Sequence, residues 1–317
     1  MRLTPQEREK LNQADINSYE PAVEQLCKHA IIRNLAVSTR DNYVGYAKRY
    51  FSYLKVYRDG VPFEKTTYDD CREFVLYLIT QQMAPKTINC YISTMAKLYY
   101  CVRHEYFDTS EVPYQKIDIH IPHAITPADF CRLYAVCSNS LEKAFICLLF
   151  CSGVRVNEAL EMRFMDIRRQ KHLIYIGPSK GRQERLTLIG DNALKELERY
   201  YYDLYGKRHV DSTSYIFMKH NRNGQLVRLT YEDARLILKR LTESACLQDR
   251  GYTLHTFRHG FAVELYRRTK DPLLLATLLG HKHLSATETY VRLAAVNSIL
   301  DNSIPNPLDT VLNENKH

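Results

Sequence analysis

One stretch of this 317-residue chain cannot be helical, and it separates two stretches that can. The segment 108–125 contains Pro113 and Pro122, and isoleucine alternates with polar residues over 117–121. A proline inside a helix removes a backbone donor and clashes with the preceding turn. We therefore predict that 108–125 is an extended linker with one domain on each side of it.

The part before the linker has apolar residues at helical spacing, and we predict a small all-helical domain over 17–107. Residues 1–37 are predicted to be a lead-in with one short helix. A longer helix should begin at Ser38, which opens a capping-box-like pattern. Two more helices should begin at Thr67 and Pro85.

The part after the linker is predicted to be a second domain over 126–297, followed by a polar tail over 298–317. Thr126 is a predicted N-cap. Helices to about Met162 should be followed by a hairpin of two short strands, and then by helices over 191–205, 230–245, 256–268, 272–279 and 286–296. The fold class is mainly α with a small β-sheet (α+β).

The composition narrows the classes of protein. Hydrophobic residues make up 45% and charged residues 25%, as in a soluble globular protein. No apolar run reaches the ~18 residues of a membrane helix, and the N-terminus lacks an apolar signal core. We expect a cytoplasmic protein with no membrane partner. The net charge of +8 suits a polyanion as partner.

Six polar residues stand out because one reaction needs them together. Attack of a tyrosine on a phosphodiester requires cations on the non-bridging oxygens, an acid for the leaving oxygen and the phenol itself. The chain offers all three in short motifs such as Gly-Val-Arg, Ser-Lys-Gly-Arg, His-Thr-Phe-Arg-His, Leu-Gly-His and Thr-Tyr. The six residues are Arg155, Lys180, His255, Arg258, His281 and Tyr290.

The order and spacing of these residues resemble the tyrosine recombinase (phage integrase) family, most strongly between Thr126 and Tyr290. The resemblance implies a helical, SAM-like core-binding domain and a catalytic domain, in a compact Xer-like or transposon-type integrase. It also implies site-specific cleavage and rejoining of double-stranded DNA through a 3′-phosphotyrosyl intermediate, by a tetramer on DNA, with no cofactor, metal or ATP. The apolar residues of the tail, Leu308, Val311 and Leu312, are expected to dock on a neighbouring protomer.

The resemblance also implies a role for each residue. Arg155 and Arg258 match the two arginines that bind the scissile phosphate, and Glu158 is expected to brace Arg155. Lys180 matches the lysine that protonates the leaving 5′ oxygen, with Arg182 as the rival for that position.

The remaining roles concern histidines and the nucleophile. His255 is implied in proton transfer, and His281 in contacting the phosphate. His259 is expected to be a packing or hydrogen-bonding residue. Tyr290, nine residues after His281, matches the nucleophile.

Other interpretations of the same residues stay open. His255 and His259 have the i, i+4 spacing of a zinc helix, but Thr256 stands where such a helix has glutamate, and Arg258 would repel a cation. A type IB topoisomerase-like relaxase shares the chemistry, and a non-catalytic DNA-binding relative shares the fold. The N-terminal helical domain disfavours the relaxase. The intact set of six residues disfavours the non-catalytic relative.

Overall fold

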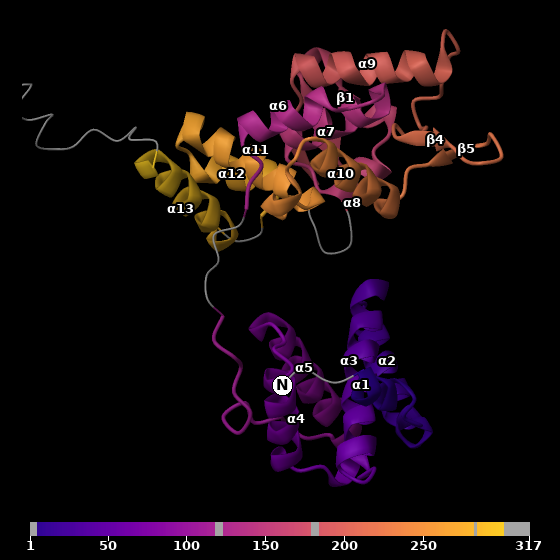
Figure 1. Ribbon diagram of the computed structural model, residues 1–317, viewed down its shortest axis with the longest axis vertical. Coiled ribbons are helices and arrows are strands. Elements are labelled where there is room, and N and C mark those ends of the chain that lie inside the picture. Colours follow the sequence, from indigo (N-terminus) through magenta and orange to yellow (C-terminus); the bar gives the residue numbers. More distant parts are fainter. Residues whose placement is uncertain (1–4, 118–122, 179–183, 282–283, 301–317) are drawn as a thin grey trace, which may run out of the picture. The chain divides into compact units, whose positions relative to one another are not determined.

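The fold is known from a computed structural model, which describes residues 5–117, 123–178, 184–281 and 284–300 (Figure 1). The chain divides into two compact units, residues 1–119 and 120–317. Both units are mainly helical, and the second contains small antiparallel sheets, so the predicted fold class is confirmed. Among the described residues, no helix has the length and apolar content needed to cross a membrane.

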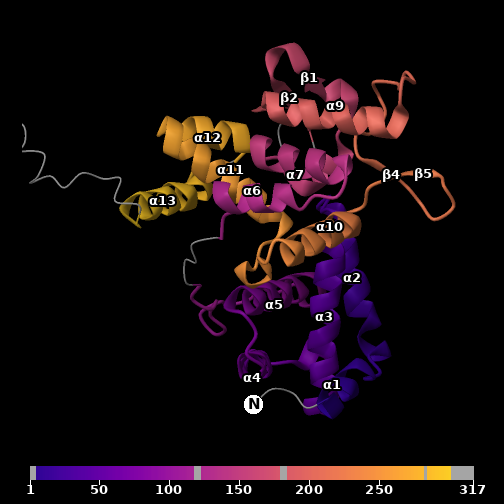
Figure 2. The same ribbon diagram turned by 45° about the horizontal axis from the view of Figure 1, so that its top comes forward.

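The first unit is a helical bundle around an aromatic core. Its elements are α1 (Pro5–Asn12), η1 (Asn17–Tyr19), α2 (Glu20–Ile32), α3 (Val37–Tyr57), η2 (Phe63–Lys65), α4 (Tyr68–Thr80), α5 (Pro85–Leu98) and the π-helical turn η3 (Tyr99–Arg103). The long helix α3 packs against α2 and α5 (Figure 2). Its Phe51 stacks on Tyr19, with ring centroids 4.6 Å apart, and the burial of such rings is the main source of stability for a unit of this size.

Two local predictions for this unit were wrong. The predicted lead-in contains the 13-residue helix α2, whose Ala22, Val23, Leu26 and Ala30 are buried in the core. Helix α3 begins one residue before Ser38, and the backbone carbonyl of the N-cap residue, rather than a side chain, accepts the first helical N–H groups. The buried apolar face of α2, and not a capping pattern, accounts for this additional helix.

The start of α4 at Thr67 is confirmed. The Asp70 N–H donates to Thr67 Oγ1 over 3.3 Å, and the Thr67 N–H donates to the Asp70 carboxylate over 2.8 Å. This reciprocal pair satisfies backbone donors that the helix itself leaves unpaired.

The second unit holds the remaining helices. They are α6 (Pro127–Ala135), α7 (Ser140–Ser152), α8 (Val156–Glu161), α9 (Asp191–Tyr205), α10 (Tyr231–Ser244), α11 (Leu254–Thr269), α12 (Pro272–Leu279) and α13 (Ser285–Leu300), with 3-10 turns η4 (Phe164–Asp166), η5 (Arg169–Lys171) and η6 (Gln248–Arg250). The predicted cap at Thr126 is confirmed, because its Oγ1 accepts the Asp129 N–H over 3.1 Å.

The predicted hairpin is confirmed as part of a three-stranded antiparallel sheet. Its strands are β1 (Ile167–Arg168), β2 (Leu173–Ile176) and β3 (Arg185–Leu188), in the order β1-β2-β3, with Tyr175 opposite Leu186. A second hairpin, β4 (Met218–His220) and β5 (Leu226–Arg228), was not predicted. Strand β3 alternates between exposed leucines and the more buried Arg185 and Thr187, so Arg185 faces the interior.

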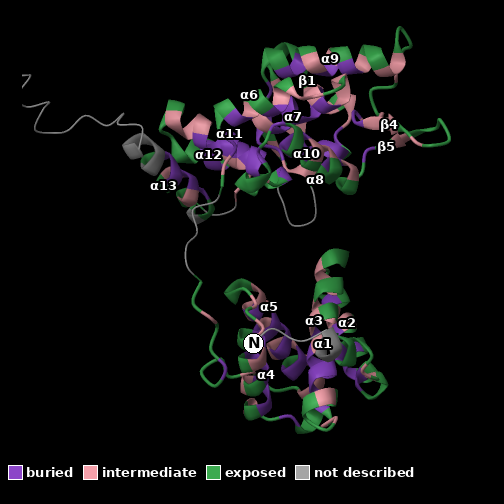
Figure 3. Cartoon of the chain, viewed as in Figure 1, coloured by how far each residue is buried: buried purple, intermediate pink, exposed green. Residues whose placement is uncertain are grey.

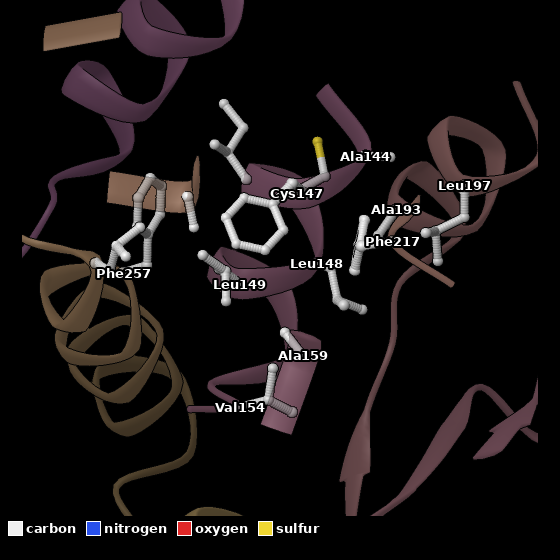
Figure 4. Packing of buried hydrophobic residues seen from close by; sticks show 14 of the residues in the cluster. Ala144, Cys147, Leu148, Leu149, Val154, Ala159, Ala193, Leu197, Phe217 and Phe257 are labelled. Carbon is white, nitrogen blue, oxygen red and sulfur yellow. The ribbon is translucent and has the colours of Figure 1, made fainter. Parts of the chain in front are cut away.

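Helix α7 forms the centre of this unit, and none of its residues is exposed (Figure 3). Phe257 of α11 lies on one side of it, and Phe217 and Leu197 lie on the other (Figure 4). The loop that carries Arg155 leaves the C-terminal end of α7, and Arg258 follows Phe257 directly. The apolar core therefore brings the two predicted phosphate-binding arginines to one place.

Candidate active site

Arg258 is the most deeply buried charged residue of the site, at 2% exposure. Its Nη1 donates to the carbonyl of Gly153 over 2.7 Å, and its Nη2 donates to the carbonyl of Leu279 over 2.6 Å. These carbonyls end α7 and α12, where backbone acceptors lack helical partners and the helix dipole favours a cation. Two helix ends thus orient the guanidinium. Gly153 adopts φ +62°, and an added Cβ would lie 2.2 Å from the Phe261 ring, so only glycine fits this turn.

Arg155 is the N-cap residue of α8, and Glu158 holds it as predicted. The Arg155 N–H donates to Glu158 Oε2 over 2.8 Å, and Arg155 Nη1 donates to Oε1 over 3.0 Å. Burial alone would raise the pKa of Glu158, but hydrogen bonds and charge from Arg185 and Arg155 outweigh it and lower the pKa to about 2. Glu158 is therefore an ionised brace at neutral pH.

Tyr290, on α13, is 5% exposed and bonds to His259 of α11. The phenol oxygen lies 3.0 Å from His259 Nδ1. Burial raises the pKa of Tyr290, while the charge of Arg258, a hydrogen bond from it and the charge of Arg155 act in the opposite direction. The pKa of His259 is lowered to about 4 by burial, by His255 and by Arg258, so this imidazole is neutral at pH 7.

The two predicted histidines, His255 and His281, lie beside His259 and Tyr290 respectively. The rings of His255 and His259 meet edge to face, 4.7 Å apart, and the rings of His281 and Tyr290 are nearly parallel, 5.9 Å apart. His281 Nδ1 lies 2.8 Å from the buried hydroxyl of Thr287, which leaves Nε2 for another partner. Burial, followed by the charges of Arg258 and Arg155, lowers the pKa of His281 to about 4. The same three causes lower the pKa of His255.

The structure thus brings together five of the six predicted residues, from α8, α11, α13 and the turns beside them. Lys180 and its rival Arg182 lie outside the described residues, because the description ends at residue 178 and resumes at 184. The site also contains residues that the sequence did not select. His259 was expected only to pack or hydrogen-bond, and no signal singled out Arg185 or Thr287.

The comparisons with known proteins cover both units. A family model described as the phage integrase family matches residues 124–296, and one described as the phage integrase N-terminal SAM-like domain matches residues 24–105. Tyrosine recombinase XerC of Anoxybacillus flavithermus is 30% identical over 244 residues, which cover 72% of this chain and 78% of the relative. Tyrosine recombinase XerA of Pyrococcus horikoshii is 24% identical over 286 residues, covering 90% of this chain and 92% of the relative.

Solved structures share the fold. The Tn1549 transposon integrase in complex with transposon right end DNA has a TM-score of 0.66 at 17% identity, covering 89% of this chain and 99% of that one. A lambda integrase dimer bound to a core site has a TM-score of 0.63 at 18% identity, covering 86% and 94%. At these identities the likeness concerns architecture, and the roles of residues have to come from the geometry of the site.

Proposed function

The chain belongs to the phage integrase family and is a tyrosine recombinase, an enzyme that cleaves and rejoins DNA strands, and we propose that Tyr290 is its nucleophile. The observation that carries this assignment is that His259 and His281 lie against one buried phenol, and that the charges of Arg258 and Arg155 act to lower its pKa. A phenol has a pKa of about 10 and is a poor nucleophile at pH 7 unless cations stabilise the phenolate.

In the proposed reaction, a phosphodiester of duplex DNA binds with its non-bridging oxygens on Arg155, Arg258 and His281. Tyr290 Oη attacks phosphorus and passes its proton to His259, 3.0 Å away. The negative phosphate raises the basicity of this imidazole, while the arginines lower the pKa of the phenol. A 3′-phosphotyrosyl bond forms as the bond from phosphorus to the 5′ oxygen breaks.

The leaving group and the reverse step complete the cycle. We assign the proton for the leaving 5′ oxygen to Lys180, and a relay role to His255, whose ring meets that of His259. Attack of a 5′-hydroxyl on the phosphotyrosine reseals a strand. The phosphotyrosyl ester conserves the energy of the phosphodiester, so resealing needs no ATP, and the guanidinium groups supply the charge that a metal ion supplies elsewhere.

The partner in this proposal is double-stranded DNA, bound in the cytoplasm by a homo-oligomer that we expect to be a tetramer. Two arguments support DNA as the partner: the net charge of +8, and the DNA present in the solved complexes of the Tn1549 and lambda integrases. A relaxase or a non-catalytic relative is not favoured, because the relatives named above are recombinases and integrases.

The test is covalent trapping. Purified protein is incubated with sheared genomic DNA of its source in excess EDTA, denatured, and the linked DNA is sequenced. We expect DNA joined to the protein through a 3′ phosphate. Absence of any adduct would refute strand cleavage, and an adduct that requires one divalent ion would refute the metal-free mechanism.

The recovered sequence then separates the two catalytic alternatives. Two copies are placed on a supercoiled plasmid, and the products are resolved on a gel. A recombinase gives deletion or inversion of the intervening DNA, whereas a relaxase gives only a ladder of relaxed topoisomers.

A further inference from the structure

Arg185 belongs to none of the predicted motifs, yet each of its three side-chain nitrogens donates to a polar group near the site. Its side chain, on strand β3, is 6% exposed. Nη1 donates to Glu158 Oε1 over 3.0 Å, and Nη2 donates to Oε2 over 2.6 Å. Nε donates to the carbonyl of Leu278 over 3.0 Å. Three of its five N–H donors are therefore engaged, and two of them go to the carboxylate of Glu158, which offsets the guanidinium charge, so Arg185 is placed as a brace and not as a phosphate ligand.

The two Nη atoms of Arg185 connect it to Arg155 through the carboxylate of Glu158, which both arginines share. Glu158 is 9% exposed and accepts from the guanidinium groups of both Arg185 and Arg155 and from the Arg155 backbone. A buried carboxylate with two cations has a narrow choice of orientation, because each oxygen has to satisfy its donors. The fork of Arg185 sets the plane of Glu158, and Glu158 in turn sets the side chain of Arg155.

The Nε atom of Arg185 bonds to the end of α12, next to the turn that carries His281. Leu278 and Leu279 are the last residues of α12, and their carbonyls accept from Arg185 and Arg258 respectively. Gly280 follows in a left-handed conformation, φ +65°, and an added Cβ would lie 2.6 Å from Arg185 Cδ. The Arg185 stem thus lies directly against the backbone that leads into His281.

We propose that Arg185 is a positioning residue of the strand-cleavage reaction, which fixes Arg155 and His281 relative to each other across the scissile phosphate. This inference rests on the proposed function, because it concerns the alignment of two groups assigned there to one phosphate. Lysine cannot replace it, because a single ammonium group lacks the planar fork that bonds to both carboxylate oxygens while Nε holds a carbonyl.

The same unit contains a matched pair that serves as a control. Arg240 of α10 bonds to both carboxylate oxygens of Glu142 on α7, with its Nε 3.1 Å from Oε1. The side chain of Glu142 is 6% exposed, so this is also a guanidinium fork on a buried glutamate. The hydrogen bonds of the Arg240 side chain go to Glu142, which is not a residue of the candidate site. Arg240 is 40% exposed and Arg185 only 6%, so the two pairs share the fork on a buried glutamate, and the melting temperatures show how far each substitution destabilises the fold.

The experiment compares these two variants on a nicked duplex carrying the sequence that the wild-type protein traps. Three quantities are measured: the melting temperature, the DNA dissociation constant by gel shift, and the single-turnover rate of adduct formation at saturating protein. For Arg185→Lys we expect the rate to fall about 10²-fold, the usual effect of misplacing a reacting group by about an ångström. The dissociation constant should stay within about threefold, because phosphate contacts are spread over the whole interface. Arg240→Lys should cleave at the wild-type rate.

A double-mutant cycle separates positioning from general stabilisation. If Arg185 acts through Arg155, then Arg185→Lys should slow an Arg155→Lys protein by much less than it slows the wild type. Independent, multiplicative defects would overturn the proposal. So would equal rate losses in Arg185→Lys and Arg240→Lys, or an Arg185→Lys defect confined to the dissociation constant.

A second variant covers the case in which Arg185→Lys does not fold. Glu158→Gln keeps the shape of the brace but weakens both arginine bonds, and it should lose cleavage rate with little change in DNA binding. A wild-type rate in Glu158→Gln would overturn the proposal. A wild-type protein that forms no adduct refutes the proposed function itself, whereas normal wild-type cleavage with unaffected variants refutes only the positioning role.

Discussion

Two buried tyrosines, one in each unit, show what distinguishes a nucleophile from a core residue. Tyr50 of α3 is 1% exposed, and its phenol lies 3.4 Å from the thiol of Cys71. Tyr290 is 5% exposed, and its phenol lies 3.0 Å from His259. Burial raises the pKa of both phenols. Burial alone is therefore not what prepares a tyrosine for chemistry.

The difference lies in the sign of the neighbouring charges. The groups around Tyr50 are Cys71, Tyr99 and Asp70, and each of them raises its pKa further. The charged groups near Tyr290 are Arg258 and Arg155, which act against the effect of burial. Burial disfavours a phenolate in both environments, but the groups around Tyr50 add to this effect and the arginines near Tyr290 oppose it. The comparison predicts that removing the two hydroxyls will have opposite consequences for activity and for stability.

The largest expected effect comes from removing the two hydroxyls in turn. Tyr290→Phe should bind the recovered DNA normally and form no covalent adduct on the nicked duplex, because the attacking oxygen is gone. Tyr50→Phe should form adduct at the wild-type rate and lose about 1 kcal/mol of unfolding free energy with its hydrogen bond. Adduct bands on denaturing gels and thermal melts measure both. A persistent adduct in Tyr290→Phe would end the assignment.

The next largest effect concerns Lys180, the acid that we assign to the leaving 5′ oxygen. Lys180→Met should slow cleavage by roughly 10²–10⁴-fold, the usual contribution of a general acid. A substrate with a 5′-bridging sulfur has a leaving group that needs little protonation, so most of the rate should return. Arg182→Met serves as the comparison. If Lys180→Met is equally defective on both substrates while Arg182→Met is rescued by sulfur, the roles are exchanged.

A smaller effect should separate the chemistry at Tyr290 from assembly. The tail has an apolar group after Pro305 and Pro307, namely Leu308, Val311 and Leu312. These residues lie outside the described part of the chain, so docking on a neighbour stays a prediction. Deleting residues 299–317 should leave single-site binding near normal and weaken two-site recombination, measured by gel shift and by plasmid deletion. Undiminished recombination would make the tail a passive end.

The smallest effect is on the melting temperature at acidic pH. It tests whether His259 is neutral in the folded protein. The pKa of His259 falls from 6.5 to about 4 in the folded protein, with His255, Arg258 and Tyr290 around it. Between these values the unfolded chain binds more protons, so His259 contributes stability above pH 6.5 that is lost as the pH falls toward 4. His259→Gln should flatten the dependence of melting temperature on pH in this window. An unchanged slope would mean that His259 is not buried in its neutral form.

Much of the fold could be predicted because its signals are local. Thr67 and Thr126 cap their helices through residues three positions away, and the hairpin follows from two short runs around a turn. The convergence of Arg155 and Arg258 could not be derived from spacing, and it entered through the resemblance to a family. The first helix of the core, α2, was missed because its polar neighbours masked four buried apolar residues.

The sequence by itself determined the fold class, most helix starts and the candidates for the cleavage reaction, since these depend on periodicity, on caps and on which chemical groups are present. Only the tertiary structure decided which groups meet. His259 contacts Tyr290 across 31 residues of chain, and Arg185 contacts Glu158 across 27. Such contacts leave no periodic trace, because the packing of α11 against α13, and of α8 and β3 against α7, brings these residues together rather than any local pattern. The charge around a buried phenol, which separates Tyr290 from Tyr50, is for that reason a property of the folded chain.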